Sequence, residues 1–130
     1  MGAAIISYLD TQTAVKLAED GVKRISRAAQ AHIARSALLI SPMTILEMQY
    51  LFEIRRIVIR ARDLQRKLQD ELGVVVCDIP FATVSAIALD ETWTRDAFDR
   101  IIVAQAKANN FAYLVTSDEI IHKHYPRAVW

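Results

Sequence analysis

The stretch AIISYLDTQTAVKLAED, residues 4–20, decides the fold of this protein. Residues 4–9 are almost continuously apolar, which is typical of a short strand that is buried on both faces of a sheet. The run ends at Asp10, and residues 12–20 follow as a predicted helix that stops at Gly21. A buried strand followed at once by a helix is the repeating unit of a parallel α/β sheet.

The alternation of strands and helices continues along the chain. Further short strands are predicted at residues 38–41, 74–78 and 113–117 and near the final AVW. Helices are predicted at residues 22–36, 44–54, 57–71 and 80–89, around Asp99, and from Asp118 onward. No linker or internal repeat interrupts this pattern. The sequence therefore predicts one domain over residues 1–130, with a three-layer α/β/α fold and a mainly parallel central sheet of about four or five strands.

Composition and charge exclude several classes of protein. The chain has 130 residues, of which 53% are hydrophobic, so it can form a substantial core. No run approaches the roughly 18 apolar residues of a membrane span, and the opening MGAAIISYLD lacks the basic segment of a signal peptide. We therefore expect a cytoplasmic protein without a membrane partner. The one cysteine, Cys77, excludes a disulfide scaffold, and a net charge of +1 means that nucleic acid would have to be attracted by a local patch.

Four carboxylates are expected at one edge of the predicted sheet. Asp10 follows the first strand and Asp118 follows the fourth, so both belong to the carboxyl edge, where ligands bind in open parallel sheets. Glu47 and Asp99 lie in the early turns of helices at the same edge, and each begins an apolar stripe. The stripe after Asp99 consists of Ile102, Val103 and Ala106, and the stripe after Glu47 consists of Tyr50, Leu51 and Ile54. Each acid thus lies on the side of its helix that should face the core.

Each of these acids has an ordinary explanation when it is taken alone. An Asp after a strand is often a turn or cap residue, Asp96 has the position of a helix cap, and an acid at the margin of a core can reach solvent. Together, however, carboxylates in partly desolvated space repel one another and take up protons. A divalent cation removes this repulsion, and oxygen ligands without His or Cys favour Mg²⁺ or Mn²⁺. The cluster therefore indicates a metal site.

Four segments of the chain carry a family resemblance. They are YLDTQ (8–12), ISPMTILEMQYL (40–51), RDAFDRIIVAQA (95–106) and YLVTSDEII (113–121). In this order they resemble PIN-domain ribonucleases, most closely the VapC-type toxins of bacterial and archaeal toxin–antitoxin modules. The resemblance implies a Mg²⁺- or Mn²⁺-dependent endoribonuclease that hydrolyses RNA phosphodiester bonds. It also implies a homodimer that is held inactive by a cognate VapB-type antitoxin.

The resemblance implies roles for individual residues as well. The acidic quartet, which would be catalytic and would hold the metal, is Asp10, Glu47, Asp99 and Asp118. Asp96 is an alternate or outer ligand, because the family often has DPFDR where residues 96–100 read DAFDR. Thr11, Thr116 and Arg100 are the candidate substrate contacts. The two threonines would also orient the acids or a metal-bound water, and Arg100 would lie near the scissile phosphate. Whether one or two ions act is left open.

Other features leave alternatives open. Trp93 is the best aromatic candidate for stacking on RNA, although it could equally cover the core. Arg55, Arg62 and Arg66 fall on one face of the predicted basic helix, which either contacts RNA or is a solvated amphipathic face. The alternatives to a nuclease are a catalytically silent PIN-like module that binds RNA or protein, and a phosphotransfer domain with Asp10 as nucleophile. The phosphotransfer domain would need a suitably placed Lys, for which the sequence offers no convincing candidate.

Overall fold

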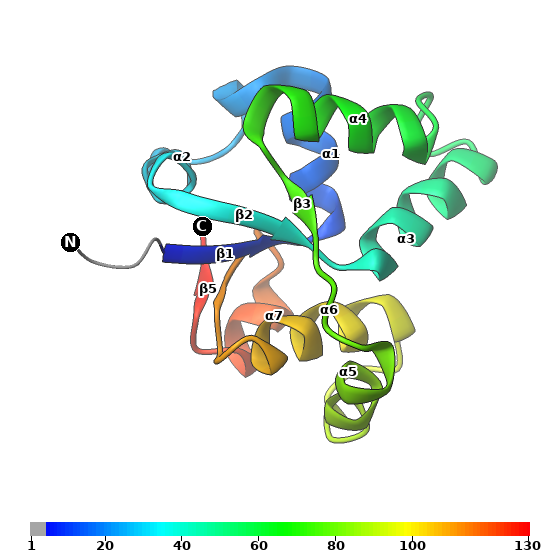
Figure 1. The fold of residues 1–130 in the computed structure, drawn as a ribbon, viewed down its shortest axis with the longest axis vertical. Coiled ribbons are helices and arrows are strands. Elements are labelled where there is room, and N and C mark those ends of the chain that lie inside the picture. Colours follow the sequence, from blue (N-terminus) through cyan, green and yellow to red (C-terminus); the bar gives the residue numbers. More distant parts are fainter. Residues whose placement is uncertain (1–4) are drawn as a thin grey trace.

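A sheet of five parallel strands forms the centre of the structure. The computed structural model describes residues 5–130, in which the strand order is β3-β2-β1-β4-β5 and every neighbouring pair is parallel (Figure 1). The strands are β1 (Ile5–Leu9), β2 (Ser36–Ile40), β3 (Val75–Val76), β4 (Tyr113–Val115) and β5 (Ala128–Val129). This sheet confirms the predicted α/β fold with mainly parallel strands. Ala4, where the first strand was predicted to begin, lies outside the described residues.

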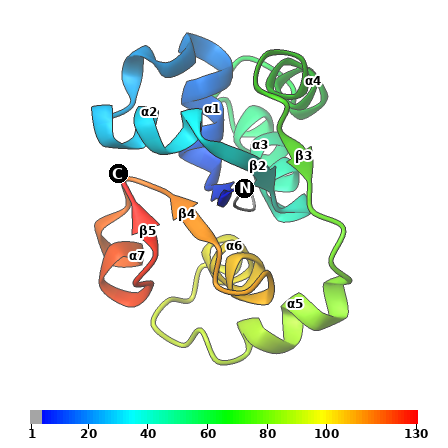
Figure 2. The same ribbon diagram turned by 60° about the vertical axis from the view of Figure 1, so that its left-hand side comes forward.

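Helices cover both faces of the sheet, as the three-layer prediction requires. They are α1 (Thr11–Asp20), the 3₁₀ helix η1 (Gly21–Arg24), α2 (Arg27–Ala34), α3 (Pro42–Glu53), α4 (Ala61–Leu72), α5 (Phe81–Ala88), α6 (Ala97–Ala108) and α7 (Glu119–His124). Figure 2 shows α1, α2, α3 and α4 above the sheet and α5, α6 and α7 below it. Among the helices that the structure describes, none is long and apolar enough to cross a membrane.

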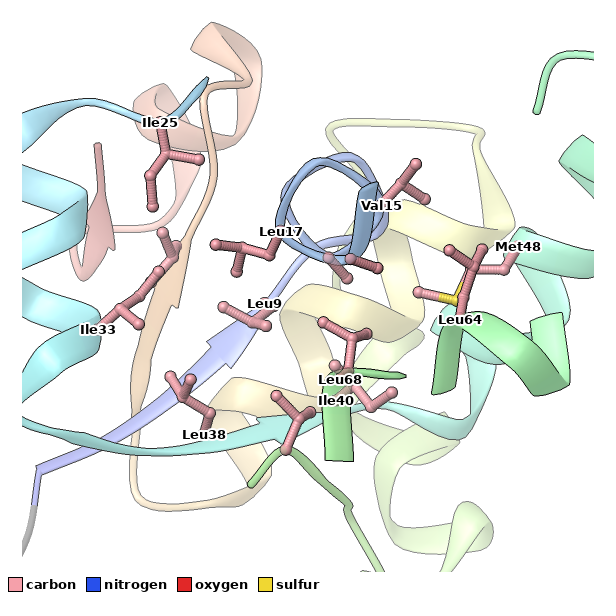
Figure 3. Packing of buried hydrophobic residues seen from close by; sticks show 14 of the residues in the cluster. Leu9, Val15, Leu17, Ile25, Ile33, Leu38, Ile40, Met48, Leu64 and Leu68 are labelled. Carbon is pink, nitrogen blue, oxygen red and sulfur yellow. The ribbon is translucent and has the colours of Figure 1, made fainter. Parts of the chain in front are cut away.

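Each face of the sheet has its own hydrophobic core. Tyr8 and Leu9 are neighbours on β1 and belong to different clusters, because side chains alternate along a strand. Leu9 packs in the larger cluster beneath α1, α3 and α4, where Figure 3 shows it near Leu17. Tyr8 belongs to the cluster on the opposite face, together with Ile102 of α6 and Ile121 of α7. The central strand β1 is therefore packed on both faces, and this packing holds Asp10, the next residue of the chain, in place.

The predicted helix over residues 22–36 is wrong in its extent. The 3₁₀ helix η1 comes first, and α2 begins only after Ser26, whose hydroxyl accepts a hydrogen bond from the backbone N–H of Ala29 (3.1 Å). Ser36 was predicted to belong to the same helix, but it begins β2 and pairs with β1. Pairing with a distant strand decides this boundary, and helical periodicity alone cannot show such pairing.

The predicted basic helix over residues 57–71 begins later than expected, because α4 begins at Ala61. Arg55 has a left-handed backbone with φ +62° and lies between α3 and α4. The residues after it alternate between half-buried and exposed side chains, with Val58 85% exposed, which is the burial pattern of an extended chain. Arg55 therefore does not share a helical face with Arg62 and Arg66, and that part of the prediction is wrong.

Candidate active site

The candidate acidic residues meet in one pocket at the carboxyl edge of the sheet. The pocket has a volume of about 330 Å³. Its lining residues are Asp10, Thr11, Gln12, Glu47, Asp96, Asp99, Ser117 and Asp118. A larger hollow of about 820 Å³ lies between α3 and α4, but its lining combines the carboxylate of Asp63 with three arginines. The concentration of carboxylates therefore singles out the smaller pocket.

Asp10 and Asp118 come from neighbouring strands and are linked through one threonine. The pairing of β1 with β4 places Leu9 opposite Val115. Asp10 and Thr116, the next residue on each strand, therefore lie side by side, and both are buried. The hydroxyl of Thr116 donates to Oδ2 of Asp10 and accepts from the backbone N–H of Asp118 (3.0 Å). One buried hydroxyl thus ties the two strand-end acids together.

Three of the carboxylates cap helices that begin at the pocket. Asp10 accepts a hydrogen bond from a backbone N–H of α1 (2.9 Å). Asp96 accepts from two N–H groups of α6 (2.9 and 3.2 Å), and Asp118 accepts from two of α7 (2.8 and 3.2 Å). The first N–H groups of a helix have no intrahelical partner and carry partial positive charge. These caps therefore give the first N–H groups of the helices hydrogen-bond partners and fix the start of each helix.

The remaining two carboxylates, Glu47 and Asp99, come from α3 and α6. Glu47 is half-buried and accepts a hydrogen bond from the hydroxyl of Thr11 at the start of α1. Asp99 is also half-buried and lies in the first turn of α6. Ile102 and Val103, which follow it on the same side of the helix, are buried in the core. Asp99 thus forms the pocket end of a stripe whose other residues pack against the sheet.

Burial and mutual repulsion raise the pKa values of three of these carboxyl groups. Burial raises the pKa of Asp10, against the opposing effect of its hydrogen bonds from two threonines. Burial also raises the pKa of Glu47, and neighbouring carboxylates add to the effect. Burial, followed by the charges of the four surrounding carboxylates, raises the pKa of Asp99 to about 7. A cation in this pocket would relieve all of these costs at once.

The donor set fits a hard divalent cation, although its side chains are not preassembled as ligands. Within residues 5–130, no three His, Cys, Asp or Glu side chains already converge as the ligands of one ion. The candidate donors of the pocket are carboxylate and hydroxyl oxygens, the ligand type that Mg²⁺ and Mn²⁺ prefer. Each carboxylate oxygen has two lone pairs, so Asp10 can bind a cation and keep its hydrogen bonds. Ligation would therefore require the carboxylates to come closer together than they lie in this structure.

Comparison with known proteins identifies the family. The family model of the PIN domain matches residues 7–126. This chain belongs to the PIN-domain family. The resemblance seen in the sequence motifs is thereby confirmed for the family. No curated protein matches the chain in a sequence search.

Solved structures share the fold of this PIN domain. One is VapBC2 from Rickettsia felis, bound to a DNA fragment from the VapBC2 promoter. It has a TM-score of 0.63 and 18% identity, and the match covers 95% of this chain and 96% of that one. DNA-bound VapBC from Salmonella typhimurium has a TM-score of 0.62 and 18% identity, covering 95% of each chain. PAE2754 from Pyrobaculum aerophilum has a TM-score of 0.59 and 20% identity, covering 98% of this chain and 90% of that one. At these identities the likeness concerns the fold alone.

Arg100 does not face the acidic pocket of this PIN domain. Its guanidinium donates to the carbonyl oxygens of Ala88 (3.1 and 3.2 Å) and Leu89 (3.2 Å) at the end of α5. The last carbonyls of a helix have no intrahelical partner, and a basic side chain can satisfy them. The side chain of Arg100 thus joins α6 to α5 and lies outside the pocket lining. Its contact with the scissile phosphate stays a prediction, which this placement does not favour.

Replacing Arg100 by Met is expected to destabilise this PIN domain without impairing its site. The change keeps the apolar stem but removes the hydrogen bonds to α5, so the free energy of unfolding should fall by about 1 kcal/mol. Urea unfolding measures this loss, and an RNA cleavage assay of the folded protein measures activity. Loss of cleavage with unchanged stability would indicate instead that Arg100 contacts the substrate.

Trp93 is engaged within the protein. Its Nε1–H donates to Oε2 of Glu91 (3.1 Å), and its ring stacks on that of His124, with centroids 5.0 Å apart and planes 8° from parallel. Trp93 also packs against the hydrophobic cluster under α6 and α7. The structure therefore supports the alternative that Trp93 covers the core, while the alternative that it stacks on RNA stays a prediction.

Sequence reasoning missed two residues that line the pocket, Gln12 and Ser117. Both side chains are exposed and polar. Ser117 lies between Thr116 and Asp118, and Gln12 follows Thr11, so their adjacency to candidate residues was the available signal. Polar residues next to strand ends are common, and adjacency alone could not separate these two from ordinary turn residues.

Proposed function

We propose that this PIN-domain protein is a Mg²⁺- or Mn²⁺-dependent endoribonuclease, the VapC-type toxin of a toxin–antitoxin module. One observation carries the proposal: the four acids of the quartet meet in a single pocket, where the pKa of Asp99 is raised to about 7. Such a cluster destabilises the folded protein, and acids with strongly shifted pKa values in one pocket are typical of functional sites. Cation binding would explain why these carboxylates are gathered in one pocket, whereas a purely structural role would not.

Asp10 and Asp99 are the proposed direct ligands. Thr116 and the start of α1 hold Asp10 in position, whereas Asp99, with its raised pKa, would exchange a proton for the cation. Asp118 and Glu47 would complete the coordination, bind a second ion or position the attacking water. A bound Mg²⁺ or Mn²⁺ would neutralise the carboxylates, activate a water molecule and stabilise the leaving 3′-oxygen of the RNA.

Two threonines and Asp96 are proposed to orient the ligands. Thr116 donates to Asp10 and Thr11 donates to Glu47, so each hydroxyl directs one carboxylate from outside the pocket centre. Asp96 caps α6 through the N–H groups of the helical turn that contains Asp99. Its proposed role is therefore that of an outer ligand, which sets the orientation of the turn from which Asp99 reaches the pocket.

The proposed partners are RNA, a VapB-type antitoxin and a second copy of this chain. Two solved structures with the same fold are VapBC complexes, which supports an antitoxin partner. RNA and the homodimer rest on the resemblance of the sequence motifs to VapC-type toxins. The same resemblance implies that the proposed antitoxin would cover the acidic pocket.

Incubation of the purified protein with total RNA tests the proposed function. We expect cleavage with Mg²⁺ or Mn²⁺, no cleavage in EDTA, and recovery when Mn²⁺ is added in excess over EDTA. The Asp10→Asn variant, purified in the same way, controls for contaminating nucleases and should leave the RNA intact. Mass spectrometry of the sample excludes a retained antitoxin. Intact RNA in every metal condition, with folded protein free of antitoxin, would contradict the proposal and favour a silent PIN-like binding module.

A further inference from the structure

Two aromatic rings lie on the helices that carry Glu47 and Asp99, one on α3 and one on α6. Tyr50 and Phe98 have ring centroids 5.8 Å apart and planes inclined at 31°. Tyr50 lies three residues after Glu47 and so on the same side of α3, and Phe98 directly precedes Asp99. The two helices that bring acids to the pocket are therefore joined by this aromatic pair.

Tyr50 is the exposed member of the pair. Its side chain is 48% exposed, whereas Phe98 is half-buried. Phe98 thus supports Tyr50 from one side and limits the orientations of its ring, while part of the tyrosine surface remains open to solvent. A partly exposed ring whose orientations are limited by a neighbouring ring is suited to stacking, because less side-chain freedom is lost on binding.

The negative charge of the pocket without a cation favours such a stacking surface for an RNA ligand. The residues described as lining the pocket include five carboxylates and no Lys or Arg, and the guanidinium of Arg100 is directed to α5. The net charge of the whole chain is only +1. An RNA strand that reaches this pocket therefore gains little from contact between its phosphates and the pocket itself. Base stacking does not depend on phosphate charge and is available for every base.

Four of the other aromatic residues are less well placed for this role. Trp93 stacks on His124, and Tyr8 and Tyr125 are buried. Phe111 is exposed, but it lies just before β4, at the edge of the sheet opposite the pocket. Tyr50 is thus the exposed ring that immediately follows a pocket acid along a helix face.

We propose that Tyr50, supported by Phe98, stacks on a nucleobase next to the phosphodiester bond that is held at the acidic pocket. This inference rests on the proposed ribonuclease function and adds a binding subsite to it. The subsite recognises an unpaired base by its flat face, so it favours single-stranded RNA and tolerates different bases. Tyr50 is a substrate-binding residue in this arrangement, and Phe98 is a positioning residue.

Equilibrium binding in EDTA tests the stacking contact without cleavage. The probes are a fluorescent single-stranded oligoadenylate and an abasic ribose-phosphate oligomer of the same length and charge. We expect the protein to bind oligoadenylate about 5- to 100-fold more tightly than the abasic probe. Tyr50→Leu should remove most of this difference by weakening oligoadenylate binding alone, whereas Tyr50→Phe should retain it. Fluorescence anisotropy measures both affinities.

Phe111→Leu is the matched control. It also replaces an exposed ring that stacks on a neighbour, since Phe111 lies 6.5 Å from the ring of Tyr125, but it does so away from the pocket. Its preference for oligoadenylate should equal that of the unaltered protein. Thermal unfolding of each variant establishes that the binding data come from folded protein.

Two outcomes of the binding assay would overturn the stacking contact. One is equal affinity of the unaltered protein for both probes. The other is an equal loss of affinity for both probes in Tyr50→Leu, which would indicate a purely structural role. Parallel cleavage assays with Mn²⁺ separate this inference from the proposed function. Cleavage by Tyr50→Leu with an unchanged KM would contradict the stacking contact and leave the proposed nuclease function intact. Base-dependent binding by a protein that cleaves no RNA would support the stacking contact and contradict the nuclease function.

Discussion

Asp99→Asn is expected to abolish RNA cleavage while the protein stays folded. The substitution preserves the shape of the side chain and removes the charge that is proposed to bind the cation directly. Loss of residues that merely orient metal ligands typically costs about 10- to 100-fold, so loss of a direct ligand should lower kcat/KM by about 100-fold or more. Initial rates at increasing Mn²⁺ concentrations separate weakened metal binding from loss of the chemical step.

Asp90→Asn provides a control with the same change of charge. Asp90 is exposed and follows α5, outside the pocket lining, so cleavage should remain within about twofold of the unaltered protein. Asp96→Asn decides between the two candidate ligands on α6, because Asn also caps helices well and preserves the start of the helix. Undiminished cleavage by Asp99→Asn, together with loss in Asp96→Asn, would reverse the proposed roles of these two residues.

In EDTA, the stability contributed by Asp99 is expected to decrease as the pH rises from about 4 to about 7. The folded pKa of about 7 lies above the ordinary value of 3.8, so the folded state holds this proton more tightly than the unfolded state does. The stabilisation is complete below the lower pKa and is lost as the pH rises through the higher one. The shift corresponds to at most about 4 kcal/mol, and solvent screening of this half-exposed group reduces the expected effect to about 1–2 kcal/mol.

The difference between the unaltered protein and Asp99→Asn isolates this contribution from that of other titrating groups. Urea unfolding across this pH range should show that Asp99→Asn becomes progressively more stable relative to the unaltered protein as the pH rises. At pH 8, Mn²⁺ should stabilise the unaltered protein and have a much smaller effect on the variant. A stability difference that does not change with pH would show that Asp99 ionises without cost in the folded protein.

The cleavage assay and the unfolding measurements both test the consequences of the partly buried carboxylate of Asp99. An aspartate that begins an apolar stripe destabilises the protein when it is ionised, because burial and four neighbouring carboxylates oppose its charge. The same arrangement would favour the proposed cation, since binding would replace repulsion with attraction. Reduced activity and increased stability in one variant would therefore be the expected sign of a site in which stability is exchanged for function.

Local sequence patterns were sufficient for the order of strands and helices and for the edge of the sheet that contains the acids. A strand buried on both faces is apolar along most of its length, so β1 and β4 could be recognised from short runs of residues. Parallel strands end at a common edge, which places Asp10 and Asp118 together without any knowledge of side-chain packing. The apolar stripes that follow Glu47 and Asp99 indicated that these two acids lie at the same edge. The structure brings all four acids into one pocket, while their catalytic role remains a prediction.

Boundaries and side-chain directions depended on contacts between residues that are distant in the chain. Ser36 belongs to β2 because it pairs with β1. The side chain of Arg100 points away from the pocket because it donates to a carbonyl oxygen at the end of α5. Tyr50 and Phe98 meet only because α3 packs against α6. Periodicity specifies which face of a helix is apolar, but it carries no information about which helix covers that face or how far apart the two lie. Packing of the complete chain supplies that information, and it therefore decides which groups surround the acids.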